Sequence, residues 1–203
     1  MLKRVHIALA VVLVTLAAMI AWQVLREREP IYQGKRLSAW LKAYRLHGLA
    51  GVETWQVRQE QQEADEALRQ AGTNALPTLL RMLRAQDSAL KVKLLRLAAR
   101  QHVIPIEYVP AEELNYRACC AFGVLRGKAR GAVPALIEVV NQNLSHDSQC
   151  YALSALAYIG PPAREAVPFL SEWVTNADGS VGSYAANALK AIAPAAAAKA
   201  GVP

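Results

Sequence analysis

The side chains best able to bind a metal or act as nucleophiles are the histidines and cysteines of this chain. The four histidines are His6, His47, His102 and His146. They share no metal-ligand spacing with one another or with the cysteines. The sequence also contains no GxSxG, P-loop or HExxH motif. These patterns predict no metal site, no cofactor and no catalytic motif.

The three cysteines, Cys119, Cys120 and Cys150, are the only thiols. Consecutive Cα atoms lie about 3.8 Å apart, which is below the usual disulfide range, so Cys119 and Cys120 are not expected to pair. An odd number of only three cysteines also argues against a disulfide framework. It does not indicate in which cellular compartment the protein lies. We interpret the cysteines as small buried side chains. They are also the candidate nucleophiles if the protein is an enzyme.

Two acidic clusters lie at the starts of predicted helices. One is Glu112 with Glu113, and the other is Glu63 with Asp65 and Glu66. Carboxylates in a first helical turn complement the positive end of the helix dipole, which is the interpretation we favour. A catalytic carboxylate pair is the alternative.

Basic residues gather between positions 69 and 100, where Asp87 is the only acid. Two sets lie away from the leucine faces of their helices, namely Arg81 with Arg84, and Lys93 with Arg96 and Arg100. A solvated outer face is the default interpretation. The functional interpretation is one positive surface for an acidic partner or for anionic lipid headgroups. Nucleic acid fits less well, because no aromatic side chains that could stack on bases lie between these cations. A domain exported across the membrane would also be separated from nucleic acid.

The segment 103–110 (VIPIEYVP) interrupts the helical pattern. Two prolines bracket β-branched and aromatic residues, which predicts extended chain. Its apolar residues Ile104, Ile106 and Tyr108 form a candidate docking edge for a peptide. Alternatively, the loop folds back and buries these three side chains over the helix ends.

Composition favours a helical domain with a basic middle part. Of the 203 residues, 54% are apolar and only 6% are aromatic. Alanine dominates the apolar set, which favours closely packed helices over a sheet. The net charge is +7, and it comes from the first two thirds of the chain, because the last third is slightly acidic. This balance allows nucleic acid, anionic lipid or acidic protein as partners and does not select among them.

A candidate membrane anchor lies at residues 5–25, which contain no Asp, Glu, Lys or Arg. As a helix this stretch is about 31 Å long, close to the hydrocarbon thickness of a bilayer. A cleaved signal peptide and a buried core helix are the alternatives. Basic residues flank both ends, but long C-terminal domains translocate largely regardless of charge. We therefore expect a single-pass inner-membrane protein with a periplasmic domain.

Three turns share one pattern of residues and predict a helical repeat. GTNALPTLL contains Gly72 and Pro77, GKARGAVPAL contains Gly127 and Pro134, and GPPAREAVPFL contains Gly160 and Pro168. Glycine suits the left-handed end of one helix, and proline suits the first turn of the next. Pro134 and Pro168 lie 34 residues apart, which is one helical hairpin, whereas Pro77 and Pro134 lie 57 apart and leave room for an insertion.

Apolar spacing predicts the helices of these hairpins. They include residues 37–44, 60–71, 76–83, 90–98, 111–125, 133–140, 150–157, 167–174 and 184–192. Ser38, Asp87 and Asp147 are the expected N-terminal caps. Ala157 and Tyr184 are expected on buried faces of their helices.

These segments resemble HEAT repeats of the short bacterial form that is grouped with phycobilisome-lyase repeats. The matching segments are CCAFGVLRGKARGAVPALIEVV, ALAYIGPPAREAVPFLSEWV and GTNALPTLLRMLRAQDS, and PIYQGKRLSAWL resembles the leader of membrane-anchored bacterial HEAT proteins. The resemblance covers about residues 30–193 and implies an α-solenoid that binds proteins. The usual Val-Arg pair is replaced by Gln149-Cys150 and Val181-Gly182, which puts the Asp–Arg ladder of the family in doubt.

The expected organisation is an anchor with a charged linker over 1–29, followed by an all-α solenoid of HEAT-like hairpins over 30–203. Within the solenoid we expect capping helices over 30–71, repeats over 72–102, 127–160 and 161–193, an insertion with a helix over 103–126, and a fraying alanine-rich tail over 194–203. The expected function is a non-enzymatic, membrane-tethered scaffold that binds an unidentified, acidic protein partner. A lyase-like HEAT enzyme or subunit and a cytoplasm-facing membrane adaptor are the alternatives.

Overall fold

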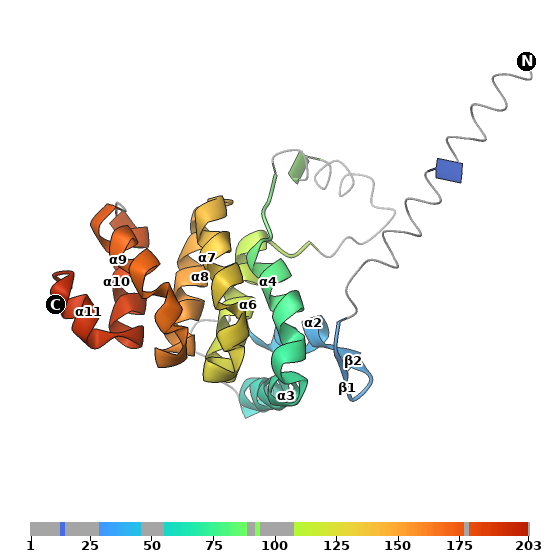
Figure 1. The fold of residues 1–203 in the computed structure, drawn as a ribbon. Coiled ribbons are helices and arrows are strands. Elements are labelled where there is room, and N and C mark those ends of the chain that lie inside the picture. The colour runs from blue at the N-terminus through green and yellow to red at the C-terminus, as the bar shows by residue number, and fades with distance from the viewer. Residues whose placement is uncertain are drawn as a thin grey trace, which may run out of the picture.

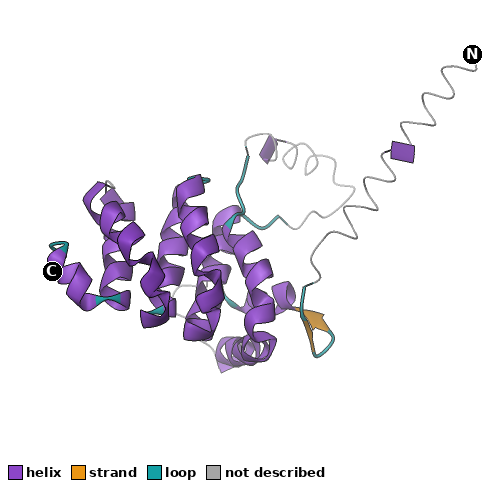
Figure 2. Ribbon diagram, viewed as in Figure 1, coloured by secondary structure: helices purple, strands orange, loops and turns teal. Residues whose placement is uncertain are grey.

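The computed structural model describes residues 13–14, 29–45, 55–88, 92–93, 108–176 and 179–202. These residues are mostly helical and form packed helix pairs, with one small hairpin of strands (Figure 2). The predicted anchor, apart from residues 13–14, lies outside the described residues. Within the described ranges, no helix combines the length and the apolar character needed to cross a membrane.

The described chain begins with a short hairpin that the all-α prediction did not include. Strand β1 (Ile31–Tyr32) pairs antiparallel with β2 (Lys35–Arg36) around a turn of Gln33 and Gly34. Both turn residues have positive φ, at 47° and 74°, as a tight hairpin turn requires. Strands this short carry no alternating apolar pattern, so periodicity could not predict them.

Helix α2 (Leu37–Trp40) continues into the 3₁₀ helix η1 (Leu41–Ala43). Its four predicted core residues are buried, namely Leu37, Trp40, Leu41 and Tyr44. The cap prediction was wrong, because the helix starts after Arg36 and Ser38 lies inside it.

The remaining elements form a row of helices joined by 3₁₀ turns. In order they are α3 (Trp55–Ala71), η2 (Gly72–Ala75), α4 (Leu76–Leu83), α6 (Ala111–Leu125), η3 (Arg126–Ala132), α7 (Val133–Gln142), α8 (His146–Ile159), η4 (Pro161–Ala166), α9 (Val167–Asn176), α10 (Gly179–Ile192) and α11 (Pro194–Lys199). Figure 1 shows the pairs α4–α6, α7–α8 and α9–α10 side by side along this row. Helix α3 begins five residues before the expected start.

The three turn prolines occupy like positions, as the repeat prediction requires. Each of α4, α7 and α9 begins one residue before its proline, at Leu76, Val133 and Val167. The missing amide of proline costs nothing there, because first-turn amides have no intrahelical acceptor.

Helix α4 packs against α6, so these two helices form the first pair along the row. The repeat predicted over 72–102 was expected to pair residues 76–83 with residues 90–98. The helix predicted over 90–98 falls almost entirely outside the described residues.

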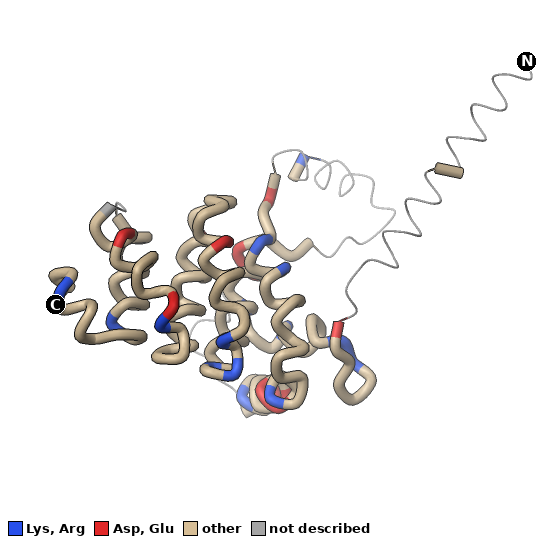
Figure 3. The backbone as a smooth tube through the Cα atoms, viewed as in Figure 1, with Lys and Arg blue, Asp and Glu red and all other residues tan. Residues whose placement is uncertain are grey.

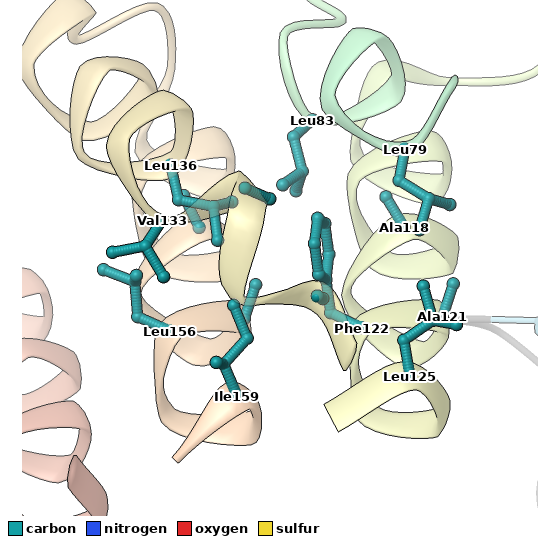
Figure 4. Packing of buried hydrophobic residues seen from close by; sticks show 14 of the residues in the cluster. Leu79, Leu83, Ala118, Ala121, Phe122, Leu125, Val133, Leu136, Leu156 and Ile159 are labelled. Atoms are coloured by element: carbon teal, nitrogen blue, oxygen red, sulfur yellow. The ribbon is translucent and has the colours of Figure 1, made fainter. Parts of the chain in front are cut away.

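A repeated pattern on the second helix of each pair builds the core. The equivalent residues are Ala118, Ala121, Phe122 and Leu125 in α6, Ala152, Ala155, Leu156 and Ile159 in α8, and Ala185, Ala188, Leu189 and Ile192 in α10. The six alanines are completely buried, and small side chains let neighbouring helices approach closely. Figure 4 shows Phe122 between the first two pairs, beneath Leu83. Burying such a side chain stabilises the fold by about 1.5–3 kcal/mol.

Two residues expected on buried faces are exposed or only half-buried. Tyr184 is 38% exposed, and Ala157 is half-buried. In both helices the repeated alanines lie on the buried face, and Tyr184 and Ala157 lie at its margin. Alanine permits closer contact between helices than a larger side chain does.

The alanine-rich tail does not fray as predicted. Residues 194–199 form α11, which packs against α9 and α10, and Ala197 is 1% exposed. The amide of Val202 donates a hydrogen bond to the carbonyl of Ala197 at 3.0 Å and closes this helix. Helix α11 therefore covers the end of the core, as a terminal unit of a repeat array must.

One acidic cap prediction was wrong. Asp147 lies in the first turn of α8, whereas Ser145 is the N-cap and accepts a hydrogen bond from the Ser148 amide at 3.1 Å. Asp87 accepts a hydrogen bond from the amide of Ala111 at 2.8 Å, so it binds the first amide of α6. The helix that Asp87 was predicted to cap lies almost entirely outside the described residues.

The turn after α6 places an arginine where the turn after α8 has a glycine. Arg126 has φ 46° and ψ −132°, and Gly160 has φ 71° and ψ −146°. The predicted alignment of Gly127 with Gly160 was therefore wrong by one residue. A residue with a Cβ is strained at such positive φ.

Replacing Arg126→Gly should stabilise the protein by about 1 kcal/mol, because glycine adopts this conformation without strain. Gly160→Ala is the matched variant and should destabilise by a similar amount, although the nearest atom to a new Cβ, the carbonyl oxygen of Ala157, would lie 3.9 Å away. Chemical denaturation followed by circular dichroism measures both. A lower midpoint for Arg126→Gly would show that the arginine side chain itself holds the turn.

Candidate functional site

The structure does not assemble the predicted basic surface from free cations. The Nη2 atom of Arg81 lies 2.6 Å from Oε1 of Glu29, and Nη2 of Arg84 lies 3.4 Å from Oε2 of Glu138. Both α4 arginines are therefore neutralised by acids from distant parts of the chain. Lys93 is exposed, whereas Arg96 and Arg100 lie outside the described residues.

Of the predicted docking segment, only Tyr108 is described, and it is 40% exposed. A hydrogen bond to Asp87 raises the pKa of the Tyr108 phenol. The same carboxylate accepts the amide of Ala111, so the end of the insertion is held against the start of α6. Ile104 and Ile106 lie outside the described residues.

A group of tyrosines lies on the second helices of the pairs, and we call it the tyrosine face. It consists of Tyr116 in α6, Tyr151 and Tyr158 in α8, and Tyr184 in α10. The rings of Tyr116 and Tyr151 meet edge to face, with centroids 6.0 Å apart and an interplanar angle of 69°. Helix α8 packs between α6 and α10, so these side chains come from three consecutive second helices of the row.

The ring of Tyr158 lies against α6 at Gly123. A Cβ at Gly123 would stand 3.7 to 3.8 Å from three carbons of that ring, which is an ordinary contact distance. Tyr158 nevertheless remains 52% exposed. One side of the ring is thus supported by protein, and the other is available for contact.

Three hydroxyls of the tyrosine face are protonated over the physiological range. Burial raises the pKa of Tyr116 to about 12 and also raises the pKa of Tyr151. The pKa of Tyr158 is raised first by the nearby Cys119 and then by burial. These three side chains are therefore uncharged and can offer hydroxyl donors beside apolar rings.

The thiols beside this face are not activated. Burial raises the pKa of Cys119 to about 12 and raises the pKa of Cys120 and Cys150 as well. The thiolate is the nucleophilic form of cysteine, so a raised pKa works against nucleophilic catalysis.

One histidine contacts two possible nucleophiles. The Nε2 atom of His146 lies 3.0 Å from Oγ of Ser180 and 3.5 Å from Sγ of Cys150. This contact joins α8 to the start of α10. Among the residues that the structure describes, no group of three or more His, Cys, Asp or Glu side chains is placed to hold a metal ion.

A half-buried polar network fixes the N-terminal helices against α6, next to the tyrosine face. Arg117 donates from Nε to the carbonyl of Tyr44 at 3.2 Å and pairs through Nη2 with Oε1 of Glu113 at 3.1 Å. The Tyr44 hydroxyl donates to Asp65. The Arg117 and Glu113 side chains are only 12% and 15% exposed, which makes this pair stronger than a surface pair.

Sequence reasoning missed two buried amides that terminate the first helices. Asn115 donates from Nδ2 to the carbonyls of Met82 and Leu83, at 2.8 and 3.0 Å. Gln149 donates from Nε2 to the carbonyl of Val140 at 3.0 Å. The two amides lie 34 residues apart, one repeat length, and this spacing between polar residues on apolar helices was the available signal.

No family model, curated protein sequence or solved structure matches this chain. The roles of the tyrosine face and of the turns are therefore argued from their geometry.

We expect all three thiols to react with iodoacetamide at pH 8 more slowly than free cysteine does. Cys119 should be the slowest, because a pKa of about 12 leaves roughly one thiolate in ten thousand at that pH. Each rate should rise with pH and should reach the free-cysteine rate in denaturant. Peptide mass spectrometry after timed labelling reports each site. A thiol in the folded protein that reacts as fast as free cysteine would become a candidate nucleophile again.

Proposed function

We propose that this protein is a non-enzymatic, membrane-tethered scaffold whose tyrosine face binds a partner protein. Its helix pairs form an α-solenoid of HEAT-like hairpins in this proposal. Like positions of three prolines, one repeat length between Pro134 and Pro168, and the shared alanine pattern support the solenoid. Helix α11 closes one end of the array, and the hairpin with α2 and α3 closes the other.

The observation that carries the proposal is the tyrosine face itself. Tyr158 and Tyr184 are 52% and 38% exposed, and Tyr116 and Tyr151 lie half-buried beside them. Tyrosine is enriched in protein interfaces because it adds a large contact area and a hydrogen-bonding group at low entropic cost. A ring already supported by its own protein, as Tyr158 is by Gly123, loses little freedom on binding.

The packing of the helices favours the tyrosine face as the inner side of a curved array. Buried alanines bring α6, α8 and α10 close together, whereas leucines and valines fill the contacts of α4 and α7. Closer spacing on one side curves a stack of hairpins toward that side. An inward curve can enclose a partner on more than one side.

The tether is proposed from the apolar stretch at residues 5–25, with the helical domain on the periplasmic side. The described chain supports a fixed connection to such an anchor. Glu29 forms its ion pair with Arg81 of α4, and the carbonyl of Pro30 accepts a hydrogen bond from the Leu37 amide at 2.9 Å. The linker therefore reaches the domain at a defined point, four residues after the apolar stretch ends.

The test is photo-crosslinking in intact membranes with p-azidophenylalanine placed at Tyr158 or Tyr184. The replacement keeps the aromatic ring and changes only the hydroxyl. We expect both positions to give the same discrete crosslinked band, because both belong to one contact surface. Tyr151→Ser should weaken that band several-fold by removing the neighbouring ring.

The matched control places the same photo-reactive residue at Glu172, which is exposed on α9. Helix α9 is a first helix of its pair, so this position should give no such band. Equal crosslinking from all three positions, or none from Tyr158 and Tyr184, would contradict the proposal.

A further inference from the structure

Four cations on the turns between helix pairs have no ion-pair partner within the described part of the chain. We call them the basic turn edge, and they are Arg126, Lys128 and Arg130 in η3 and Arg164 in η4. All four are exposed. Figure 3 shows the basic residues of η3 and η4 at the lower end of the helix row.

Five other described arginines form ion pairs with acids of this chain. These pairs are Arg45 with Glu60, Arg69 with Asp65 and Glu66, Arg81 with Glu29, Arg84 with Glu138, and Arg117 with Glu113. The basic turn edge therefore groups four cations whose positive charge is left for an external anion.

Two of these arginines line one pocket. Its volume is about 410 Å³, and its lining consists of Arg130, Pro161, Pro162 and Arg164. Two proline rings give it a rigid apolar wall, and no carboxylate belongs to the lining. A site of this size accommodates a side chain or a short peptide segment.

Close contact between the two turns holds the pocket in shape. A Cβ on Gly127 would stand 3.1 Å from Cγ of Pro162, so glycine permits η4 to press against η3. Ala129 in η3 and Ala163 in η4 are completely buried. Each turn is thus anchored one residue before its arginine.

The two pocket arginines are equivalent residues of successive repeats. Arg130 and Arg164 lie 34 residues apart, the same interval as Pro134 and Pro168. Stacked repeats therefore display two guanidinium groups about one hairpin spacing apart, roughly 10 Å. A guanidinium group binds a carboxylate through two parallel hydrogen bonds, which is a stronger and more directional contact than lysine offers.

We propose that this pocket binds carboxylate side chains from an acidic segment of a partner protein. The proline wall can pack against the methylene groups of glutamate side chains. The two arginines can each bind the carboxylate of one such side chain. Glu165 follows Arg164 and is exposed, so it would repel a uniformly anionic bilayer, whereas a peptide can place its carboxylates away from it. This inference rests on the proposed function and adds the chemistry of the partner.

The experiment uses the full chain in nanodiscs of neutral phosphatidylcholine and a fluorescein-labelled hexaglutamate peptide. Fluorescence anisotropy should show binding of hexaglutamate and none of hexaglutamine. The double variant Arg130→Gln with Arg164→Gln should weaken binding by about tenfold or more, because it removes both charge-assisted contacts to the carboxylates. Added salt should weaken peptide binding by the double variant less steeply than it weakens binding by the unmodified protein.

The matched control is Arg45→Gln with Arg69→Gln, which removes the same charge from arginines that already have acid partners. It should change the affinity by less than about twofold. Equal weakening by both double variants would overturn the proposal, since the effect would then be one of net charge. Unchanged binding in the Arg130→Gln, Arg164→Gln variant would also overturn it.

Two further measurements separate other anions from an acidic peptide. Displacement of hexaglutamate by equimolar inorganic phosphate would overturn the proposal in favour of a phosphate site. Binding to phosphatidylglycerol vesicles that depends on Arg130 and Arg164, without peptide binding, would overturn it in favour of a membrane contact. If the peptide fails to bind while the crosslinks from Tyr158 and Tyr184 persist, this inference falls and the proposed function stands.

Discussion

The interaction on which the structure depends is the packing of α8 against α6 on one side and against α10 on the other. Each of α6, α8 and α10 places two completely buried alanines at equivalent positions. This spacing lets three helices lie side by side, and it aligns the turns at one end and the tyrosines on one side. A helical hairpin alone cannot bury its apolar face, so each pair depends on its neighbour for stability.

Both proposed surfaces follow from the same stacking. Neighbouring second helices bring Tyr116 of α6 against Tyr151 of α8, and they lay Tyr158 on Gly123. Neighbouring turns bring Arg130 and Arg164 to one pocket. Neither surface exists within a single helix pair, because the pocket takes residues from two turns and the tyrosine face takes residues from three helices. A change in the distance between repeats would therefore alter both.

Much of the helical fold could be predicted from local signals. The positions of Pro77, Pro134 and Pro168 fix where the first helices begin, because proline is favoured only in a first turn. Apolar spacing located most of the buried residues. The packing of α4 against α6 was not predicted, because residues 90–98 have a helical pattern of their own and local periodicity does not say which two helices will pack together. The tail was mispredicted because alanine is compatible both with a frayed end and with close burial.

The candidate site was harder to predict, since its decisive contacts are long-range. Arg81 and Arg84 meet acids 52 and 54 residues away, and no local pattern indicates that their charge is neutralised. Tyr151 and Tyr184 share one position, directly before the first buried alanine of their helices, but Tyr116 and Tyr158 do not, so spacing alone does not unite all four. Arg130 and Arg164 were visible at the repeat interval within the two turn motifs. Their function was missed because those motifs were interpreted only as structural turns.

The most direct test of the alanine contact compares two alanine-to-leucine variants on α10. Ala188 is completely buried against the neighbouring helix, whereas Ala191 is exposed. Because alanine and leucine have similar helix propensities, packing is the main difference between the two sites. Chemical denaturation should show that Ala188→Leu lowers the free energy of unfolding by about 1–3 kcal/mol, and that Ala191→Leu changes it by less than about 0.5 kcal/mol. Equal stability of the two variants would contradict the account, because it would mean that the stack does not depend on close approach at these alanines.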